Sequence, residues 1–194
     1  MACTALTKGR GLDCNRISGG VKKIFFSVFD EDVSYTYDAT HKLEIDAIDW
    51  NGSTIFEYVM PLGVASVTDT ITGSRENGTI FYTPTVNIML NRLTKEDQNE
   101  IKLLGATKVR IFAELNETLA NGHNVFIALG MSNGMELNAG TMDSGAGFGD
   151  RNGYTLTFDG LENIPFAMLE DYTTIPWDQA GFINEAATFP TTGA

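Results

Sequence analysis

The sequence has little of what several classes of protein require. It contains two cysteines in 194 residues, too few for a disulfide scaffold. Its longest largely apolar run, residues 24–29, is far shorter than the roughly 18 residues of a membrane-spanning helix. The first twenty residues also lack the apolar core of a secretory signal. We therefore expect a protein that is made inside the cell and does not enter a membrane.

Positive charge is scarce as well, and it is concentrated at one end of the chain. There are 13 Lys and Arg residues against 25 Asp and Glu residues, a formal net charge of −12. Residues 1–29 hold five basic side chains and one acidic one, whereas from residue 30 onward 24 acidic side chains face 8 basic ones, a net charge of −16. Such a body repels nucleic acid, whose binding relies on Lys and Arg. The basic segment can instead dock onto a neighbouring copy, or be a solvated arm without a partner.

Turn signals, in contrast, are abundant. Asn-Gly, the dipeptide that best suits a type I′ hairpin turn, occurs at residues 51–52, 77–78, 121–122, 133–134 and 152–153. Runs rich in Val, Ile, Thr and aromatic residues flank most of these turns, and apolar and charged residues alternate along 42–47. This pattern predicts a mainly β protein, an antiparallel β-sandwich or β-barrel.

Two further segments refine this prediction. Residues 94–104 read as one flanking α-helix, with Thr94 as N-cap, Gly105 just past its end, and Leu93, Ile101 and Leu104 facing a core. Residues 24–29 are apolar on both faces of a strand, which indicates a strand covered on both sides, either within the core or at a subunit interface.

The expected organisation is an extended basic amino-terminal arm (1–20), a sandwich or barrel domain (21–165) and a carboxy-terminal extension (166–194). The arms lack the periodicity of helices or strands.

Signals for catalysis or ligand binding are weak. His41 and His123 have no spaced set of carboxylates or cysteines near them in sequence, so no zinc site is predicted. Cys3 and Cys14 are expected to be reduced thiols, although the two can pair if the arm folds back. The glycine-rich stretch 140–150 lacks the spacing of a phosphate-binding loop and predicts a flexible loop between strands. We predict no catalytic, metal-binding or cofactor-binding residue, and no enzyme.

Several segments together resemble the tail tube (major tail) proteins of tailed bacteriophages, over roughly residues 3–165. They are the cysteine-containing arm Met1–Cys14, Gly19–Phe26, Ser74–Thr79, the helical run Leu93–Leu104 and Gly153–Gly160. The resemblance implies a virion protein that assembles in the host bacterial cytoplasm into hexameric rings, which stack into a hollow tail tube. It also implies an inner β-barrel shared between copies, an arm or long loop that bridges rings, and an electronegative lumen through which DNA passes without binding.

The resemblance suggests roles for particular residues. Glu44 and Asp46 are candidate lumen-facing residues, although a strand with a solvated outer face has the same sequence pattern. The candidate inter-subunit contacts lie in the arm and in the hairpin around residues 74–79, which is otherwise an ordinary surface turn: Lys8, Arg10, Arg16, Ser74, Arg75, Glu76 and Asn77. The implied partners are further copies of the chain and other phage tail or neck proteins, with no membrane.

Two alternatives stay open. A neck or connector ring protein of the virion has the same sequence features. A monomeric carbohydrate-binding or hydrolytic β-sandwich belongs to a different class, and would use Trp50 or Trp177 as a platform for a sugar ring.

Overall fold

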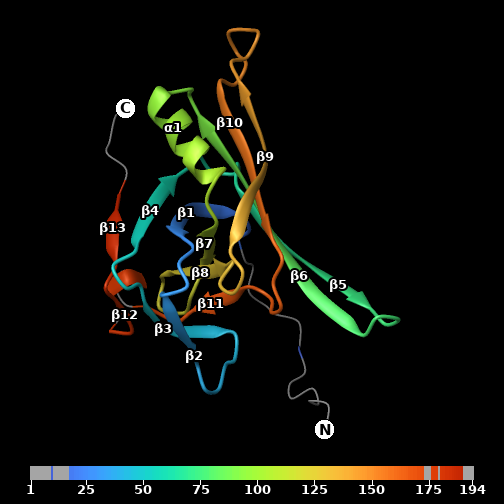
Figure 1. The fold of residues 1–194 in the computed structure, drawn as a ribbon. Helices are drawn as coiled ribbons and strands as arrows, with labels where there is room; N and C mark the ends of the chain where they lie inside the picture. The colour runs from blue at the N-terminus through green and yellow to red at the C-terminus, as the bar shows by residue number, and fades with distance from the viewer. Residues whose placement is uncertain (1–9, 11–17, 173–175, 179, 190–194) are drawn as a thin grey trace.

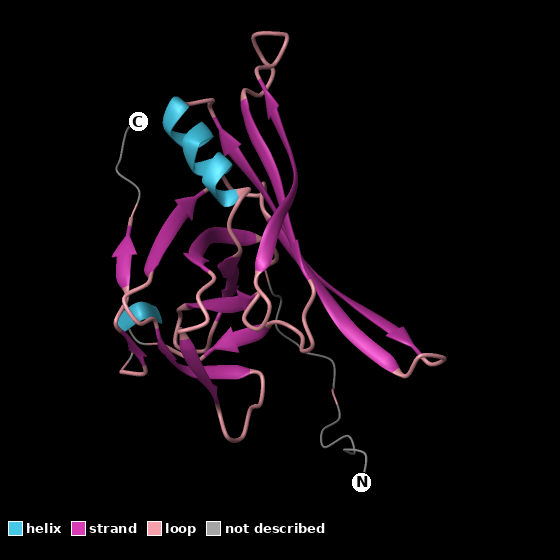
Figure 2. Cartoon of the chain, in the orientation of Figure 1, coloured by secondary structure: helices cyan, strands magenta, loops and turns pink. Residues whose placement is uncertain are grey.

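The computed structural model describes residue 10 and residues 18–172, 176–178 and 180–189. Figure 2 shows that these residues are mostly strands, with one α-helix and one short 3-10 helix. In chain order the elements are β1 (Val21–Val28), β2 (Ser34–Tyr37), β3 (Glu44–Asp49), β4 (Thr54–Val59), β5 (Ser66–Ser74), β6 (Thr79–Asn91), α1 (Lys95–Leu104), β7 (Val109–Thr118), β8 (Asn124–Leu129), β9 (Met135–Asp143), β10 (Gly153–Gly160), β11 (Ala167–Leu169), η1 (Pro176–Asp178), β12 (Phe182–Ile183) and β13 (Ala186–Thr188). The described part of the chain is mainly β with a single flanking α-helix, as the sequence predicts.

One group of strands curls around an aromatic core. β1 pairs with β4 and β7, and the sheet continues from β7 through β8 and β11 to β3. The carboxy-terminal segment then bridges the two ends, because β12 pairs with β3 and β13 pairs with β4. The enclosed side chains form what we call the barrel core, which includes Phe25, Ile45, Phe112, Phe126 and Trp177.

A second layer packs against the outside of this group. β9, β10, β6 and β5 pair in that order, all antiparallel, and a single bridge between Val109 and Met135 joins them to β7. Their inward side chains form the sandwich core with those of β1 and β7, and α1 adds the buried Ile101. β1 is therefore covered on both faces: Ile24 and Phe26 lie in the sandwich core and Phe25 in the barrel core. This confirms the intramolecular interpretation of residues 24–29.

The helix begins and ends where the sequence indicates. Thr94 has an extended backbone, and its side chain accepts a hydrogen bond from the backbone N–H of Asp97 at 3.0 Å. Gly105 is the C-cap and donates its N–H to the carbonyl of Ile101 at 2.9 Å. Leu93 differs from the expectation, because it precedes the helix and is exposed rather than facing a core.

The N-cap at Thr94 leads to the first prediction. Replacing Thr94 by Ala leaves the Asp97 N–H without this acceptor, so we expect the free energy of unfolding to fall by about 1 kcal/mol. Urea denaturation of the wild-type and variant chains measures the difference. Thr40→Ala, at an exposed threonine in a turn, is the matched control and is expected to change stability by less than about 0.5 kcal/mol. Equal stability of Thr94→Ala and wild type would contradict the capping role.

The Asn-Gly turns were only partly correct as hairpin signals. Residues 77–78 lie in the loop joining the paired strands β5 and β6, and residues 121–122 join β7 to β8. Asn51 and Gly52 have the positive φ angles of 47° and 82° that a type I′ turn requires, yet β3 and β4 pair with other strands. Residues 133–134 likewise connect β8 and β9, which each pair elsewhere, and Gly153 is already the first residue of β10.

The carboxy-terminal extension is more regular than the sequence indicates. Beyond residue 165 the described residues add β11, β12 and β13, which run parallel to β3 or β4. The predicted antiparallel pattern therefore holds for the rest of the sheet but not for these three pairings. No helix in the described part of the chain is long and apolar enough to span a membrane.

Candidate functional site

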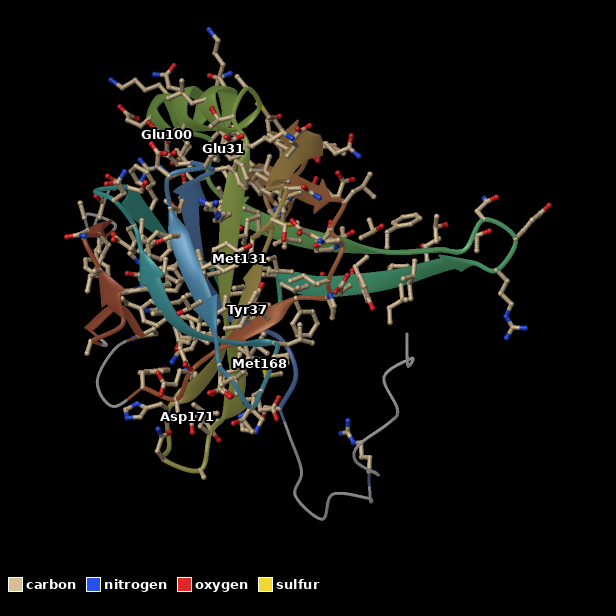
Figure 3. All side chains as sticks on the ribbon, turned by 60° about the horizontal axis from the view of Figure 1, so that its bottom comes forward. Glu31, Tyr37, Glu100, Met131, Met168 and Asp171 are labelled. Atoms are coloured by element: carbon tan, nitrogen blue, oxygen red, sulfur yellow. The ribbon has the colours of Figure 1, made fainter. Side chains whose placement is uncertain are left out.

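A long two-stranded ribbon, formed by β5 and β6, extends away from the body of the molecule (Figures 1 and 3). The pairing runs from Ser66–Asn87 at its base to Ser74–Thr79 at its tip. From Thr70 to Phe81 every residue except Ser74 is exposed. Nothing in the described part of this chain therefore packs over the outer half of the ribbon.

The two faces of the ribbon differ in chemistry. Directly paired residues share a face, so Ile71 lies beside Tyr82 and Gly73 beside Ile80 on one side. Ile71 is 64% exposed and Ile80 is 60% exposed. The opposite side carries mainly threonine, with Thr70 beside Thr83 and Thr72 beside Phe81, which is 38% exposed. The ribbon is thus amphipathic, and its apolar face is open to solvent.

The outer edge of the ribbon is also open. β5 is the last strand in the sheet order and pairs only with β6 in the described residues. Its side-chain contacts to the body lie near its base, where Val67 packs against the sandwich core and Asp69 Oδ2 accepts a hydrogen bond from the Phe166 N–H at 3.0 Å. An exposed strand edge with free backbone groups is a template for pairing with another chain.

The predicted contact residues of the hairpin lie at the tip of this ribbon. Ser74 Oγ accepts a hydrogen bond from the Asn77 N–H at 3.2 Å, and Arg75 and Glu76 are exposed between them. Of the arm residues, Arg10 is exposed, whereas Lys8, Arg16, Cys3 and Cys14 lie outside the described residues.

The candidate lumen residues lie far from the ribbon tip, on β3. A β-bulge interrupts the alternation expected there: Thr36 pairs with Ala47 and Tyr37 with Ile45, which leaves Asp46 without a partner in this register. Ile45 and Ile48 therefore both reach the barrel core, and Ala47, expected on the apolar face, does not. Glu44 and Asp46 are both half-buried.

Glu44 and Asp46 belong to a larger group of carboxylates. Burial raises the pKa of Glu170, and the nearby negative charges of Asp46, Glu44 and Asp171 raise it further. This end of the body, on the side away from Glu100 of α1, carries Met168 and Asp171 in Figure 3. The region is electronegative, which suits a cationic partner or a surface that repels DNA.

The cluster of carboxylates around Glu170 leads to a second prediction. Asp46→Asn removes one negative charge beside Glu170, so we expect the pKa of Glu170 to fall toward its ordinary value. A carbon-detected NMR titration of the side-chain carboxyl measures the shift. Asp159→Asn, on β10, is the matched control and should leave that pKa unchanged. If both variants titrate like the wild type, the proximity of these charges is refuted.

An open groove of about 780 Å³ lies beside this region. Its apolar floor is formed by Leu43, Leu119, Phe166 and Met168. Four carboxylates also line it, against one lysine and one histidine: Glu44, Glu117, Glu170 and Asp171, with Lys42 and His41. Met168 is 49% exposed because it points outward between Ala167 and Leu169, which are both buried. We call this feature the acidic groove.

His41 lies closer to carboxylates than predicted, because Asp38 and Glu44 are three residues away on either side of it. Its Nδ1 lies 3.0 Å from Glu44 Oε2 and 3.5 Å from Asp38 Oδ1. Asp38, His41 and Glu44 are the group within the described residues whose ligand atoms are close enough to hold a metal ion. Asp38 also accepts hydrogen bonds from the backbone N–H groups of Thr40 and His41, which lowers its pKa. The group thus forms a local turn.

The glycine-rich stretch forms the end of the β9–β10 hairpin. Asp150 accepts hydrogen bonds from the N–H groups of Ala146 and Gly147, at 3.0 and 2.6 Å, which lowers the pKa of its carboxyl. These two loop N–H groups therefore already have an acceptor within the loop. Phe148, at its tip, is fully exposed.

The tryptophans do not form sugar platforms. Trp50 is 0% exposed and Trp177 is 3% exposed, and the two rings contact each other in the barrel core with centroids 5.9 Å apart. This part of the carbohydrate-binding alternative was wrong, because both side chains are needed to fill the core. A polar groove of about 690 Å³ includes Glu136 and Asp159, but Lys108 pairs with Glu136 and Asn138 donates to Asp159. It gives no specific support for a hydrolase.

Sequence reasoning missed the two apolar surfaces. The hairpin at residues 74–79 was predicted, but its exposed apolar face was not, although the alternation of threonine with other residues along 68–72 is a signal for two different faces. The acidic groove could not be predicted, since Leu43 and Met168 are far apart in the chain and meet only because β11 pairs with β3.

Comparisons with protein-family models, with curated proteins and with solved structures found no match to this chain.

Proposed function

We propose that this chain is a structural virion protein that assembles with further copies of itself into stacked rings, which form the tail tube of a bacteriophage. The observation that carries this proposal is the protruding ribbon of β5 and β6. A two-stranded ribbon alone is at best marginally stable in water. A neighbouring copy that covers Ile71 and Ile80 and pairs with the edge of β5 supplies what the single chain lacks.

The charge distribution also supports a conduit. The body from residue 30 onward carries a net charge of −16, so DNA would pass a wall made of such bodies without adhering to it. Glu44 and Asp46 remain candidates for that wall. DNA is then only a non-specific cargo, and the specific partners are further copies and other tail or neck proteins, in the virion. The proposal requires no catalytic residue, metal or cofactor.

Sedimentation velocity of the purified chain at increasing concentration tests the proposal. We expect species many times heavier than the 21.1 kDa monomer, growing as concentration rises. A neck ring would instead stop at one closed ring of fixed mass. A 21.1 kDa monomer that persists at high concentration would refute self-assembly of either kind.

A further inference from the structure

The acidic groove has the chemistry of a receptor for a basic, partly apolar segment. Its floor includes Leu43, 41% exposed, and Met168, 49% exposed, two large apolar side chains that water would otherwise contact. Glu44, Glu117 and Asp171 stand around them. A segment that carries both apolar and cationic side chains is complementary to both features.

The chain itself contains such a segment at its amino terminus. Residues 1–17 include three cationic side chains, Lys8, Arg10 and Arg16, against one acidic side chain, Asp13. Leu6, Leu12 and Ile17 lie among them. From residue 30 onward the chain has an excess of acid, so its positive charge is concentrated where this segment is.

The segment leaves the body next to the groove. Asn116 donates its side-chain Nδ2–H to the carbonyl of Gly19 and its backbone N–H to the carbonyl of Gly20, each at 3.1 Å. The next residue, Glu117, lines the groove. Seventeen extended residues span roughly 55 Å. A compact chain of 194 residues, in comparison, has a radius of gyration of about 16 Å. The segment is therefore long enough to reach an adjacent copy.

We propose that the acidic groove receives residues 1–17 of a neighbouring copy. Leu6, Leu12 and Ile17 supply the apolar side chains for the floor, and the three cations face the carboxylates. Arg10, the residue of this segment that the structure describes, is exposed and is not among the described residues that line the groove. That the arm comes from a second copy rests on the assembly proposed above. In this arrangement Glu44 contacts the arm, and Asp46 is left as the candidate lumen residue on β3.

The two cysteines provide a direct test, because Cys3 and Cys14 are the only thiols in the sequence and both lie in this segment. The cysteines of the full-length chain are coupled to a benzophenone maleimide. Copies at natural isotope abundance are then mixed with ¹⁵N-labelled copies and irradiated. We expect crosslinks from Cys14 to Met168 or Leu43, in peptide pairs that combine the two isotopes. Crosslinks confined to single copies, or to other surfaces, would overturn the proposal.

A matched pair of variants tests the groove without the label. Met168→Lys places a cation on the floor, while Met142→Lys makes the same change at a methionine on β9 that is 54% exposed and outside the groove. A fluorescent peptide of residues 1–17 is titrated into each full-length variant, and anisotropy reports binding. We expect Met168→Lys to weaken binding at least tenfold and Met142→Lys to leave it within twofold. Equal binding by both would place the peptide elsewhere.

The outcomes separate this inference from the proposed function. If the chain forms tubes but its crosslinks avoid the groove, the arm inference fails and the tube stands. If the chain remains a monomer by sedimentation while the peptide binds in the groove, the tube fails and the groove remains a receptor for this segment.

Discussion

Replacing Ile71 and Ile80 together by Asp will stop the chain from assembling and leave its body folded. The two side chains are largely exposed on one face of the ribbon, so the change costs the monomer little. In the assembly they are expected to be buried, and full burial of an isoleucine contributes about 1.5–3 kcal/mol. Loss of both should raise the concentration needed for assembly about a hundredfold or more. Light scattering across a concentration series measures that threshold.

The control places the same charges on the other face of the same ribbon. Thr72 and Thr79 are exposed diagonal neighbours there, as Ile71 and Ile80 are on the apolar face, so Thr72→Asp with Thr79→Asp keeps the net charge and the spacing matched. We expect this variant to assemble at a concentration much closer to that of the wild type. Circular dichroism checks that both variants are folded. If the isoleucine variant assembled at the same concentration as the wild type, the apolar face of the ribbon would not be a contact between copies.

Trp177→Ala will lower the free energy of unfolding by about 3–5 kcal/mol, the range for removing a buried tryptophan side chain. Trp177 comes from the short η1 helix, yet its ring meets four strand side chains in the barrel core: Phe25 at 5.2 Å, Phe112 at 5.5 Å, Phe126 at 6.0 Å and Phe182 at 6.3 Å between centroids. Its removal opens the core at the place where the carboxy-terminal segment bridges β3 and β4. Urea denaturation of the purified variant measures the loss.

Phe148→Ala is the matched control for the tryptophan. It also truncates an aromatic side chain, but one that is fully exposed at the tip of the β9–β10 hairpin, so stability should change by less than about 0.5 kcal/mol. A cost below about 1 kcal/mol for Trp177→Ala would show that residues 176–189 lie outside the cooperative core. The carboxy-terminal segment would then be an appendage and not part of the core.

Local signals predicted the elements that depend on local chemistry. Thr94 and Gly105 mark the ends of α1, and residues 124–129 form β8 as expected. The apolar run at 24–29 correctly indicated a strand with two covered faces, because Phe25 and Phe26 must each enter a core. These features are set by residues next to one another in sequence.

Long-range pairing was beyond the reach of the same signals. The turn at Asn51–Gly52 forms, but β3 pairs with β2, β11 and β12, and β4 pairs with β1 and β13, strands that lie far from them in the sequence or carry no strong signal of their own. β11, β12 and β13 have two or three residues each, too short for a recognisable alternation. The acidic groove depends on β11, so it was hidden for the same reason.

Electron microscopy of the purified, concentrated chain in negative stain tests the central claim most directly. The account predicts closed rings with a central channel, which stack into hollow tubes, and it predicts that the Ile71→Asp, Ile80→Asp chain forms neither. A field of single 21.1 kDa particles at every concentration, with no ring or tube, would contradict it.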